Sequence, residues 1–116
     1  MTMPKLKRFE SNPKYDMVGA GWNHYCPACE TTHGFAVDEP FRNGAKWTFD
    51  GNMDAPTFSP SMNIRIGPMP SDHPRAGQFD VCHYFLRAGV IEFLPDCTHE
   101  LRGQRVPLPD LTERRP

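Results

Sequence analysis

The sequence predicts a mainly β fold, built as a small antiparallel sheet with hairpins and at most one short helix. Short runs rich in Val, Ile, Phe, Tyr and Trp alternate with turn residues, as is typical of antiparallel sheets. The chain also carries 13 prolines and 9 glycines in 116 residues, so loops are plentiful and the core is thin. A Cys-x2-Cys pair with further cysteines and histidines downstream makes the predicted fold zinc-ribbon-like, because bound metal stabilises small domains.

The first half of the chain predicts an arm followed by short strands. Residues 1–16 are polar, contain two prolines and show no sustained period, so we expect an extended N-terminal arm. Residues 17–25 predict a strand that enters the Cys-Pro-Ala-Cys turn at 26–29, with a second strand on its far side. A further short strand is expected at 46–49, between two turn signals.

The second half predicts a strand with an irregular start, followed by one clear hairpin. Residues 57–66 alternate apolar side chains, and Pro60 indicates an edge position or a bulge near the start of that strand. After a loop at 67–78, residues 79–94 predict a hairpin closed by a three-residue Arg-Ala-Gly loop. Residues 96–103 suit one or two helical turns, with aspartate as N-cap and glycine at the end.

Composition favours one zinc-stabilised domain at 17–110 with a polar tail at 111–116. The net charge of −1 and the pI near 6.5 give no net attraction to nucleic acids or anionic membranes, so neither is an expected partner. No stretch reaches the ~18 apolar residues that span a bilayer, and the start lacks the apolar core of a secretion signal. We therefore expect a soluble intracellular protein, in which cysteines favour metal ligation over disulfides.

Cys26 and Cys29 are the first predicted metal ligands. Their Cys-x2-Cys spacing is that of a zinc knuckle, in which a tight turn points two thiolates at one ion. A thioredoxin-type redox dithiol is the alternative, but such a pair usually opens a helix, and here the flanks predict strands. Iron is the alternative metal for a cysteine-rich site. A structural zinc site needs four ligands, so two more are required.

Cys82 and Cys97 are our first choice for the remaining two ligands. On a regular strand Cys82 and His83 point to opposite faces, and the chemistry of a zinc site favours the thiolate. A three-residue hairpin loop sets Cys82 opposite Leu94, from where Cys97 would fold back toward the cluster. The substitutes for the fourth ligand are three histidines: His99, His83 and His33.

The sequence predicts no catalytic residue. A catalytic zinc needs an open coordination position and a general base, and His99-Glu100 is the only adjacent His-Glu pair. Neither the deaminase pattern nor His-Glu-x-x-His is present, and a site rich in cysteine is normally closed. Ser59 and Ser61 either line a pocket or cap a turn; the absence of a Gly-x-Ser-x-Gly elbow favours the cap.

Several blocks of the chain carry a resemblance to a known family. They are Cys26-Pro-Ala-Cys29, Trp47-Thr-Phe, Pro56-Thr-Phe-Ser-Pro-Ser61, the run from Cys82 to Gln104, and Val106-Pro-Leu-Pro-Asp. Together they resemble, over about residues 20–110, a family of short proteins encoded by tailed phages and prophages. Its members often bear the name ammonia monooxygenase, a membrane-bound copper enzyme unlike a chain with no apolar span. The resemblance implies a phage origin, a zinc site at these cysteines and no established activity.

On these grounds the expected function is that of a phage-encoded zinc-binding protein without catalytic activity, such as a virion accessory protein of the head or tail. The polar arm and the Pro-rich end of the chain suit docking onto a virion or host protein, or onto another copy of the chain. The expected location is the host cytoplasm or the virion. Two alternatives remain, an intracellular phage regulator that binds a host protein and a zinc-dependent hydrolase.

Overall fold

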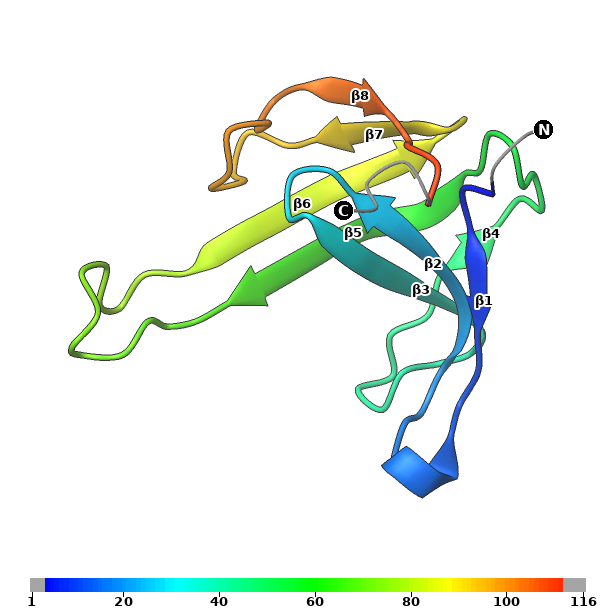
Figure 1. Ribbon diagram of the computed structural model, residues 1–116, viewed down its shortest axis with the longest axis horizontal. Coiled ribbons are helices and arrows are strands. Elements are labelled where there is room, and N and C mark those ends of the chain that lie inside the picture. Colours follow the sequence, from blue (N-terminus) through cyan, green and yellow to red (C-terminus); the bar gives the residue numbers. More distant parts are fainter. Residues whose placement is uncertain (1–3, 112–116) are drawn as a thin grey trace.

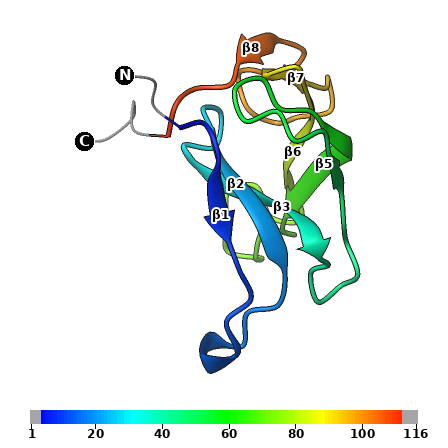
Figure 2. The same cartoon turned by 90° about the vertical axis from the view of Figure 1, so that its right-hand side faces the viewer.

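Two antiparallel sheets make up the protein, which confirms the mainly β prediction. The computed structural model describes residues 4–111, and Figure 1 shows the order of their strands. The smaller sheet has the order β1-β2-β3, with β1 (Lys7–Phe9), β2 (Ala20–Cys26) and β3 (Thr31–Glu39). The larger sheet has the order β4-β5-β6-β7-β8, with β4 (Thr48–Phe49), β5 (Phe58–Ile66), β6 (Asp80–Arg87), β7 (Val90–Phe93) and β8 (Arg105–Pro107). Figure 2 shows the two sheets as separate layers.

The N-terminal segment predicted as an arm contributes a strand to the smaller sheet. β1 pairs antiparallel with β2, and η1 (Pro13–Tyr15) is the only helix of residues 4–111. Asn12 caps this short 3₁₀ helix by accepting a hydrogen bond from the backbone of Lys14. In the described part of the chain no helix is long and apolar enough to cross a membrane. Residues 1–3 of the predicted arm and 112–116 of the predicted tail lie outside the described residues.

A tight turn joins β2 to β3 and places both knuckle cysteines at one end of the smaller sheet. The backbone N–H of Glu30 donates to the carbonyl of Cys26 at 2.8 Å, and Glu30 itself has a φ of +57°. A left-handed residue closes such a turn by reversing the chain over a short distance. The predicted strand, tight turn and second strand are therefore confirmed.

β5 contains the bulge that Pro60 predicted. Phe58 pairs with Leu86 and Met62 pairs with Tyr84, so three residues of β5 lie opposite the single residue Phe85 of β6. Such an insertion interrupts the regular alternation and redirects the side chains that it contains. Ser61 is the last residue of this bulge.

The predicted hairpin is confirmed, but its loop has two residues and not three. Arg87 pairs with Val90, which leaves Ala88 and Gly89 as the turn, with φ values of +49° and +76°. Positive φ at both central residues is the two-residue geometry that suits the twist of a hairpin. The N–H of Ala88 donates to Oγ1 of Thr57, the residue before β5, at 2.8 Å. This contact stabilises the two-residue loop. The register of β6 and β7 therefore differs by one residue from the expected one.

The segment 96–103, predicted as helical turns, forms irregular turns. Two single turns occur there, closed by Arg102 N–H to His99 C=O at 3.3 Å and by Gln104 N–H to Leu101 C=O at 3.0 Å. The expected N-cap residue, Asp96, directs its side chain to His83 instead. Without a capping side chain the start of a helix is less stable. Residues 96–103 therefore form turns that run beside β6 in place of a helix.

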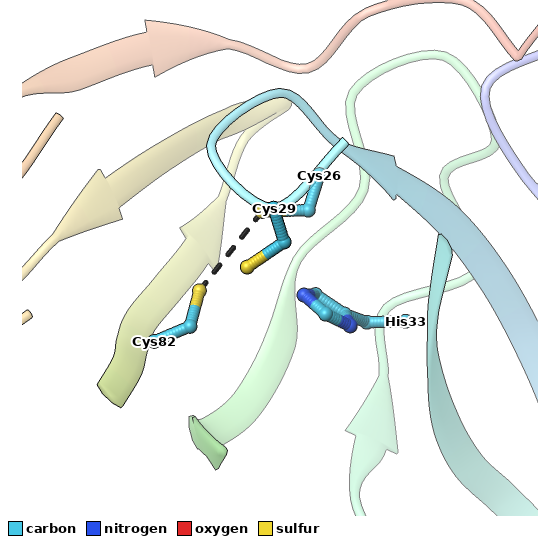
Figure 3. Close-up of side chains that lie close together, drawn as sticks. All are labelled: Cys26, Cys29, His33 and Cys82. Atoms are coloured by element: carbon cyan, nitrogen blue, oxygen red, sulfur yellow. Dashed lines mark hydrogen bonds between the residues drawn. The ribbon is translucent and has the colours of Figure 1, made fainter. Parts of the chain in front are cut away.

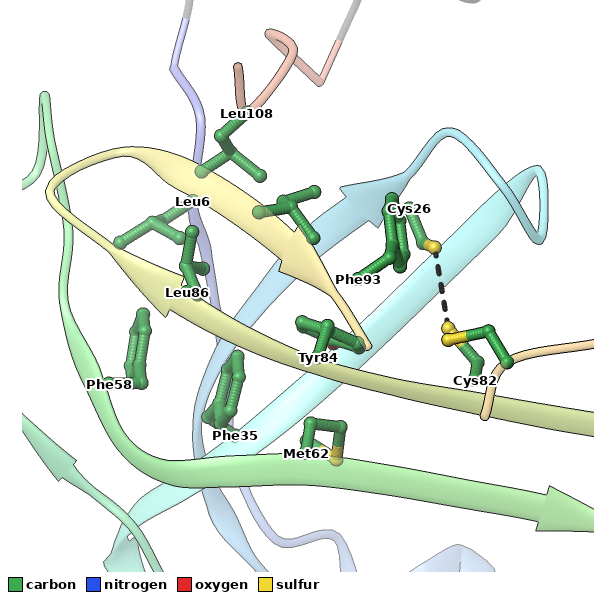
Figure 4. Close-up of a cluster of buried hydrophobic side chains, with 12 residues drawn as sticks. Leu6, Cys26, Phe35, Phe58, Met62, Cys82, Tyr84, Leu86, Phe93 and Leu108 are labelled. Carbon is green, nitrogen blue, oxygen red and sulfur yellow. Dashed lines mark hydrogen bonds between the residues drawn. The ribbon is translucent and has the colours of Figure 1, made fainter. Parts of the chain in front are cut away.

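Aromatic side chains from both sheets fill the core. Phe35 stacks on Phe58 with ring centroids 4.3 Å apart, and Phe58 stacks on Phe49 at 4.6 Å. Four buried residues of β6 and β7 continue this core: Tyr84, Leu86 and Phe93, which Figure 4 labels, and Ile91. These four lie on one face of the larger sheet, whereas Val81, also buried, and His83 lie on the opposite face of β6.

Among residues 4–111, His24 is the one buried side chain of a polar residue. Its Nε2 lies 2.6 Å from the hydroxyl of Tyr84, and its Nδ1 lies 3.2 Å from the carbonyl of Tyr25. A carbonyl only accepts, so Nδ1 carries the proton and Nε2 accepts from the tyrosine O–H. Burial lowers the pKa of His24 to about 4, so the ring is neutral.

Candidate functional site

β6 carries two neighbouring residues that point to opposite faces of the larger sheet. Cys82 is buried on the face that meets the smaller sheet, whereas the side chain of His83 is 22% exposed on the other face. This alternation was predicted from the sequence and follows from the two-residue period of a strand. Each residue belongs to a different cluster of reactive side chains.

Four side chains on the inner face are arranged as a metal site. Cys26 ends β2, Cys29 lies in the knuckle turn, His33 is on β3 and Cys82 is on β6 (Figure 3). Their ligand atoms all lie within 4.8 Å of one another. Zinc bonds of about 2.3 Å to sulfur place two thiolates of a tetrahedral site about 3.8 Å apart. The Sγ atoms of Cys26 and Cys82 are 3.9 Å apart, so the spacing fits that ion.

The electrostatics of these thiols also suit a cation. The hydrogen bond from Cys82 is the main reason why the pKa of Cys26 falls to about 3, and the same bond raises the pKa of Cys82 above the ordinary range of a thiol. Burial is the main cause that raises the pKa of Cys29 to about 11. Repulsion from the Cys26 thiolate thus disfavours ionisation of the neighbouring thiols. A divalent cation would offset this repulsion between thiolates.

His33 fits the same site. Its Nε2 is buried and has no hydrogen-bond partner among residues 4–111. Buried polar atoms are nearly always satisfied, so an atom of this kind beside three thiols suits a ligand. The predicted Cys26, Cys29 and Cys82 are therefore brought together, and the fourth position of the cluster is occupied by His33, one of the three substitutes.

Cys97, our first choice for the fourth ligand, lies outside this cluster. Its Sγ accepts from the backbone N–H of His83 at 3.2 Å and donates to the carbonyl of the same residue at 3.1 Å. His99 is also outside, with its Nδ1 accepting from the N–H of Leu101 at 3.2 Å. The geometry thus favours His33 over Cys97, while the ligand set itself stays a prediction.

The outer face of β6 carries a second cluster, formed by Ser61, His83 and Asp96. Ser61 Oγ lies 3.2 Å from His83 Nε2, and His83 Nδ1 lies 3.1 Å from Asp96 Oδ2. A carboxylate only accepts, so Nδ1 carries the proton and Nε2 accepts the hydroxyl proton of Ser61. This is the relation of nucleophile, general base and orienting acid in a serine hydrolase.

Three different elements supply these side chains. Ser61 comes from the bulge of β5, His83 from β6 and Asp96 from the turn that follows β7. The N–H of Leu94 donates to the carbonyl of His83 at 2.9 Å, which extends the ladder of β6 and β7 by one pair. Because the chain turns immediately afterwards, Asp96 returns beside the imidazole.

Neighbouring groups fix the backbone of this triad. Trp47 Nε1 donates to the carbonyl of Ser61 at 3.2 Å, and the Cys97 thiol bonds to both backbone polar groups of His83. Ser61 is half-buried, whereas the Asp96 side chain is 55% exposed. The contacts of Trp47 and Cys97 therefore hold the backbones of Ser61 and His83 in place.

The sequence named all three members of this triad but gave them other roles. Ser61 was interpreted as a turn cap, Asp96 as a helix N-cap and His83 as a substitute metal ligand. The useful signal was the Pro-Thr-Phe-Ser-Pro-Ser block, where a proline interrupts a strand and predicts a bulge. Bulges occur often beside active sites, because they redirect a side chain.

Comparison with known proteins gives one family. A family model described as the bacterial ubiquitination-like system serine protease, BubE, matches residues 5–94. The matched segment includes all four residues of the metal cluster, together with Ser61 and His83. No curated protein and no solved structure matches the chain.

Proposed function

Because the chain belongs to the BubE family of serine proteases of bacterial ubiquitination-like systems, we propose that it is a serine protease with Ser61 as nucleophile. The single observation that carries this proposal is the hydrogen-bonded chain from Ser61 through His83 to Asp96, with distances of 3.2 and 3.1 Å. The order serine, histidine, aspartate along the chain differs from those of three unrelated serine hydrolase folds. Triads are recognised by geometry and roles, and not by order.

The family corrects the function expected from the sequence. A non-catalytic phage protein, whether a virion accessory or a regulator, was expected, and the match to a serine protease family overturns that expectation. A zinc-dependent hydrolase is likewise replaced by a serine hydrolase. The expectation missed the triad because its members come from three segments that only the β5 bulge and the register of β6 and β7 bring together.

The triad assigns a role to each of its side chains. Ser61 Oγ attacks the carbonyl carbon of the scissile bond while His83 Nε2 takes the hydroxyl proton. The Nδ1–H of His83 donates to Asp96, which orients the ring and stabilises the imidazolium that forms. His83 then gives its proton to the leaving amine, and an acyl ester remains on Ser61. A water molecule hydrolyses that ester with His83 acting again as general base.

The partner of this activity is a protein. The family is named for a ubiquitination-like system, so we propose that the substrate is a protein of such a system, cleaved at a peptide or isopeptide bond. A protein partner was also expected from the sequence, although from a virion or a host. Association with a second copy of the chain stays a prediction.

The metal cluster has a supporting role in this proposal. Three thiols and one imidazole make a closed four-ligand set, which is typical of structural zinc. A bound ion would link β2, β3 and β6, and Cys82 directly precedes the catalytic His83. Zinc at this site would thus stabilise the strand that positions the general base, without contact with substrate.

Ester hydrolysis tests the proposed nucleophile. The wild-type protein should release a burst of p-nitrophenol from p-nitrophenyl acetate, because the acyl group transfers to Ser61. Ser61→Ala should abolish the burst, whereas Ser59→Ala, at an exposed hydroxyl two residues away, should retain it. A burst that persists in Ser61→Ala would refute the assignment.

Elemental analysis tests the metal assignment. We expect about one zinc ion per chain, since the cluster offers four ligands. Cys26→Ser and His33→Ala should lower that content, whereas Cys97→Ala should preserve it. Loss of zinc in Cys97→Ala with retention in His33→Ala would restore the ligand set first predicted from the sequence.

A further inference from the structure

One edge of β5 is left open beside the proposed nucleophile. β4 pairs with β5 only at Phe58 and Ser59, whereas β5 continues to Ile66. Figure 1 shows β5 running well past β4 toward the loop at 67–78. The remainder of that edge therefore lacks a neighbouring strand in the described part of the chain.

The register identifies which backbone groups point to this edge. The N–H of His83 donates to Cys97 and its carbonyl accepts from Leu94, so both groups point away from β5. Asn63 lies opposite His83 and forms a non-hydrogen-bonded antiparallel pair with it. In a pair of this kind the backbone N–H and C=O of each residue point away from the other strand. The N–H and C=O of Asn63 thus face the open edge.

Arg65 repeats the same arrangement one pair further along. It lies opposite Val81, whose N–H donates to Thr98 Oγ1 and whose carbonyl accepts from the N–H of Thr98. Asn63 and Arg65 are both exposed, and their backbone groups have no hydrogen-bond partner among residues 4–111. The open edge thus offers two donors and two acceptors in alternate positions.

The open edge begins at the nucleophile. Trp47 Nε1 donates to the carbonyl of Ser61, so this side chain closes the edge on the near side of Asn63. An extended peptide laid against Asn63 and Arg65 would therefore reach the Ser61 hydroxyl and then be forced to leave the sheet. Unpaired strand edges are templates for such strand addition.

We propose that this edge of β5 binds the substrate main chain as an added antiparallel strand, with the residues before the scissile bond against Arg65 and Asn63. This inference rests on the proposed protease function. The antiparallel direction follows from β4, which already pairs with the same edge in that direction. The peptide then runs from Arg65 toward Ser61, and its leaving group turns outward at Trp47.

A substrate that binds to this edge must present an extended, flexible segment of its chain. Recognition through main-chain groups requires an accessible strand-like stretch before the cleaved bond and tolerates many side chains. A folded helix or a tight turn cannot present alternate N–H and C=O groups in this way. Cleavage should thus be confined to tails and linkers of the partner protein.

Peptidyl phosphonates of different length provide the test. Alanyl diphenyl phosphonates with one, two and four residues react with a serine nucleophile, and their inactivation rates report binding before the reacting atom. In the wild-type protein the four-residue compound should react about tenfold faster than the one-residue compound, because two or more hydrogen bonds are added. No gain with length would overturn the proposal.

Paired variants separate the backbone from the side chains. Asn63→Pro and Arg65→Pro remove an outward N–H that has no described partner, and each should lose most of the gain with length. Asn63→Ala and Arg65→Ala keep the N–H and should retain the gain. Equal behaviour of the proline and alanine variants would contradict recognition through the backbone.

Two further measurements keep the test decisive. Melting temperature and zinc content identify a proline variant that fails to fold. If a proline variant fails to fold, the wild-type protein is tested instead with four-residue compounds in which one amide at a time is N-methylated. Methylation should slow the reaction only at every second amide. If no phosphonate modifies Ser61, the protease proposal itself fails, and this inference fails with it.

Discussion

The two faces of β6 use the same strand for different chemistry. Inward, Cys82 joins residues of β2, of β3 and of the turn between them in a metal cluster. Outward, His83 joins Ser61 of β5 and Asp96 of the turn after β7 in a triad. In the inner cluster Cys26 and Cys82 are buried, His33 is half-buried and Cys29 is exposed. In the outer cluster the side chains of His83 and Asp96 are 22% and 55% exposed. Alternation along one strand thus separates the metal cluster from the proposed triad by a single residue.

Because their residues lie on opposite faces of β6, neither cluster interferes with the other. Thiolates are strong nucleophiles and metal ligands, and a histidine that served zinc would lose its basic nitrogen. Because Cys82 and His83 point apart, the metal cluster leaves the His83 imidazole free for Ser61. A slip of one residue in the register of β6 would exchange the two roles and destroy both sites.

His83→Ala should produce the largest effect on activity. Removal of the general base of a serine protease lowers kcat by about 10⁴-fold or more, because the serine hydroxyl is a weak nucleophile alone. Zinc content should stay at the wild-type value, since the imidazole lies on the other face from the cluster. Steady-state kinetics and elemental analysis on one preparation check both statements, with His73→Ala as the matched control.

Cys26→Ser should produce the converse result. This variant removes a ligand buried between the sheets, so bound zinc should be lost and the free energy of unfolding should fall by several kcal/mol. Calorimetry measures that fall, and activity assayed well below the lowered melting temperature should suffer less than in His83→Ala. A variant that keeps its stability without zinc would contradict a structural role.

Asp96→Asn should lower kcat by about 10²- to 10⁴-fold, because the amide no longer stabilises the imidazolium or fixes the tautomer of His83. The matched control is Asp80→Asn, at a carboxylate of similar exposure that begins β6 and is paired with Arg75. Its activity should stay near the wild-type value. Similar losses in both variants would show that the loss of any carboxylate charge near β6 lowers the activity, and not the loss of the triad.

Tyr84→Phe should have the smallest effect and should act on stability alone. The lost hydroxyl donates to His24 at 2.6 Å in the core, so its removal leaves a buried acceptor unsatisfied. We expect the free energy of unfolding to fall by about 1–2 kcal/mol with zinc content and kcat unchanged. Denaturant titration measures this, with Tyr15→Phe at an exposed ring as control.

Much of the fold was predictable from local signals. The knuckle turn, the hairpin, the bulge at Pro60 and the opposite directions of Cys82 and His83 all follow from turn chemistry and strand alternation. The metal cluster was predicted in three of its four members for the same reason. Apart from Cys82, which was chosen because thiolate chemistry suits zinc, these features depend on residues close to one another in the chain.

The triad was not predictable, because it depends on one residue of register. A three-residue loop would set Leu94 opposite Cys82, whereas the observed two-residue loop sets Leu94 beside His83 and brings Asp96 to the imidazole. That loop requires Ala88 at positive φ, where it bonds to Thr57 on a neighbouring segment. A tertiary contact of this kind leaves no signal in the local sequence.

Labelling with a fluorophosphonate tests directly whether Ser61 is the nucleophile. The wild-type protein is treated with a fluorophosphonate, digested and mapped by mass spectrometry. We expect a single adduct on Ser61 that is lost in His83→Ala and retained in Ser59→Ala. An adduct on another residue, or no adduct on a folded, zinc-loaded protein, would contradict the assignment of Ser61, His83 and Asp96 as the catalytic triad.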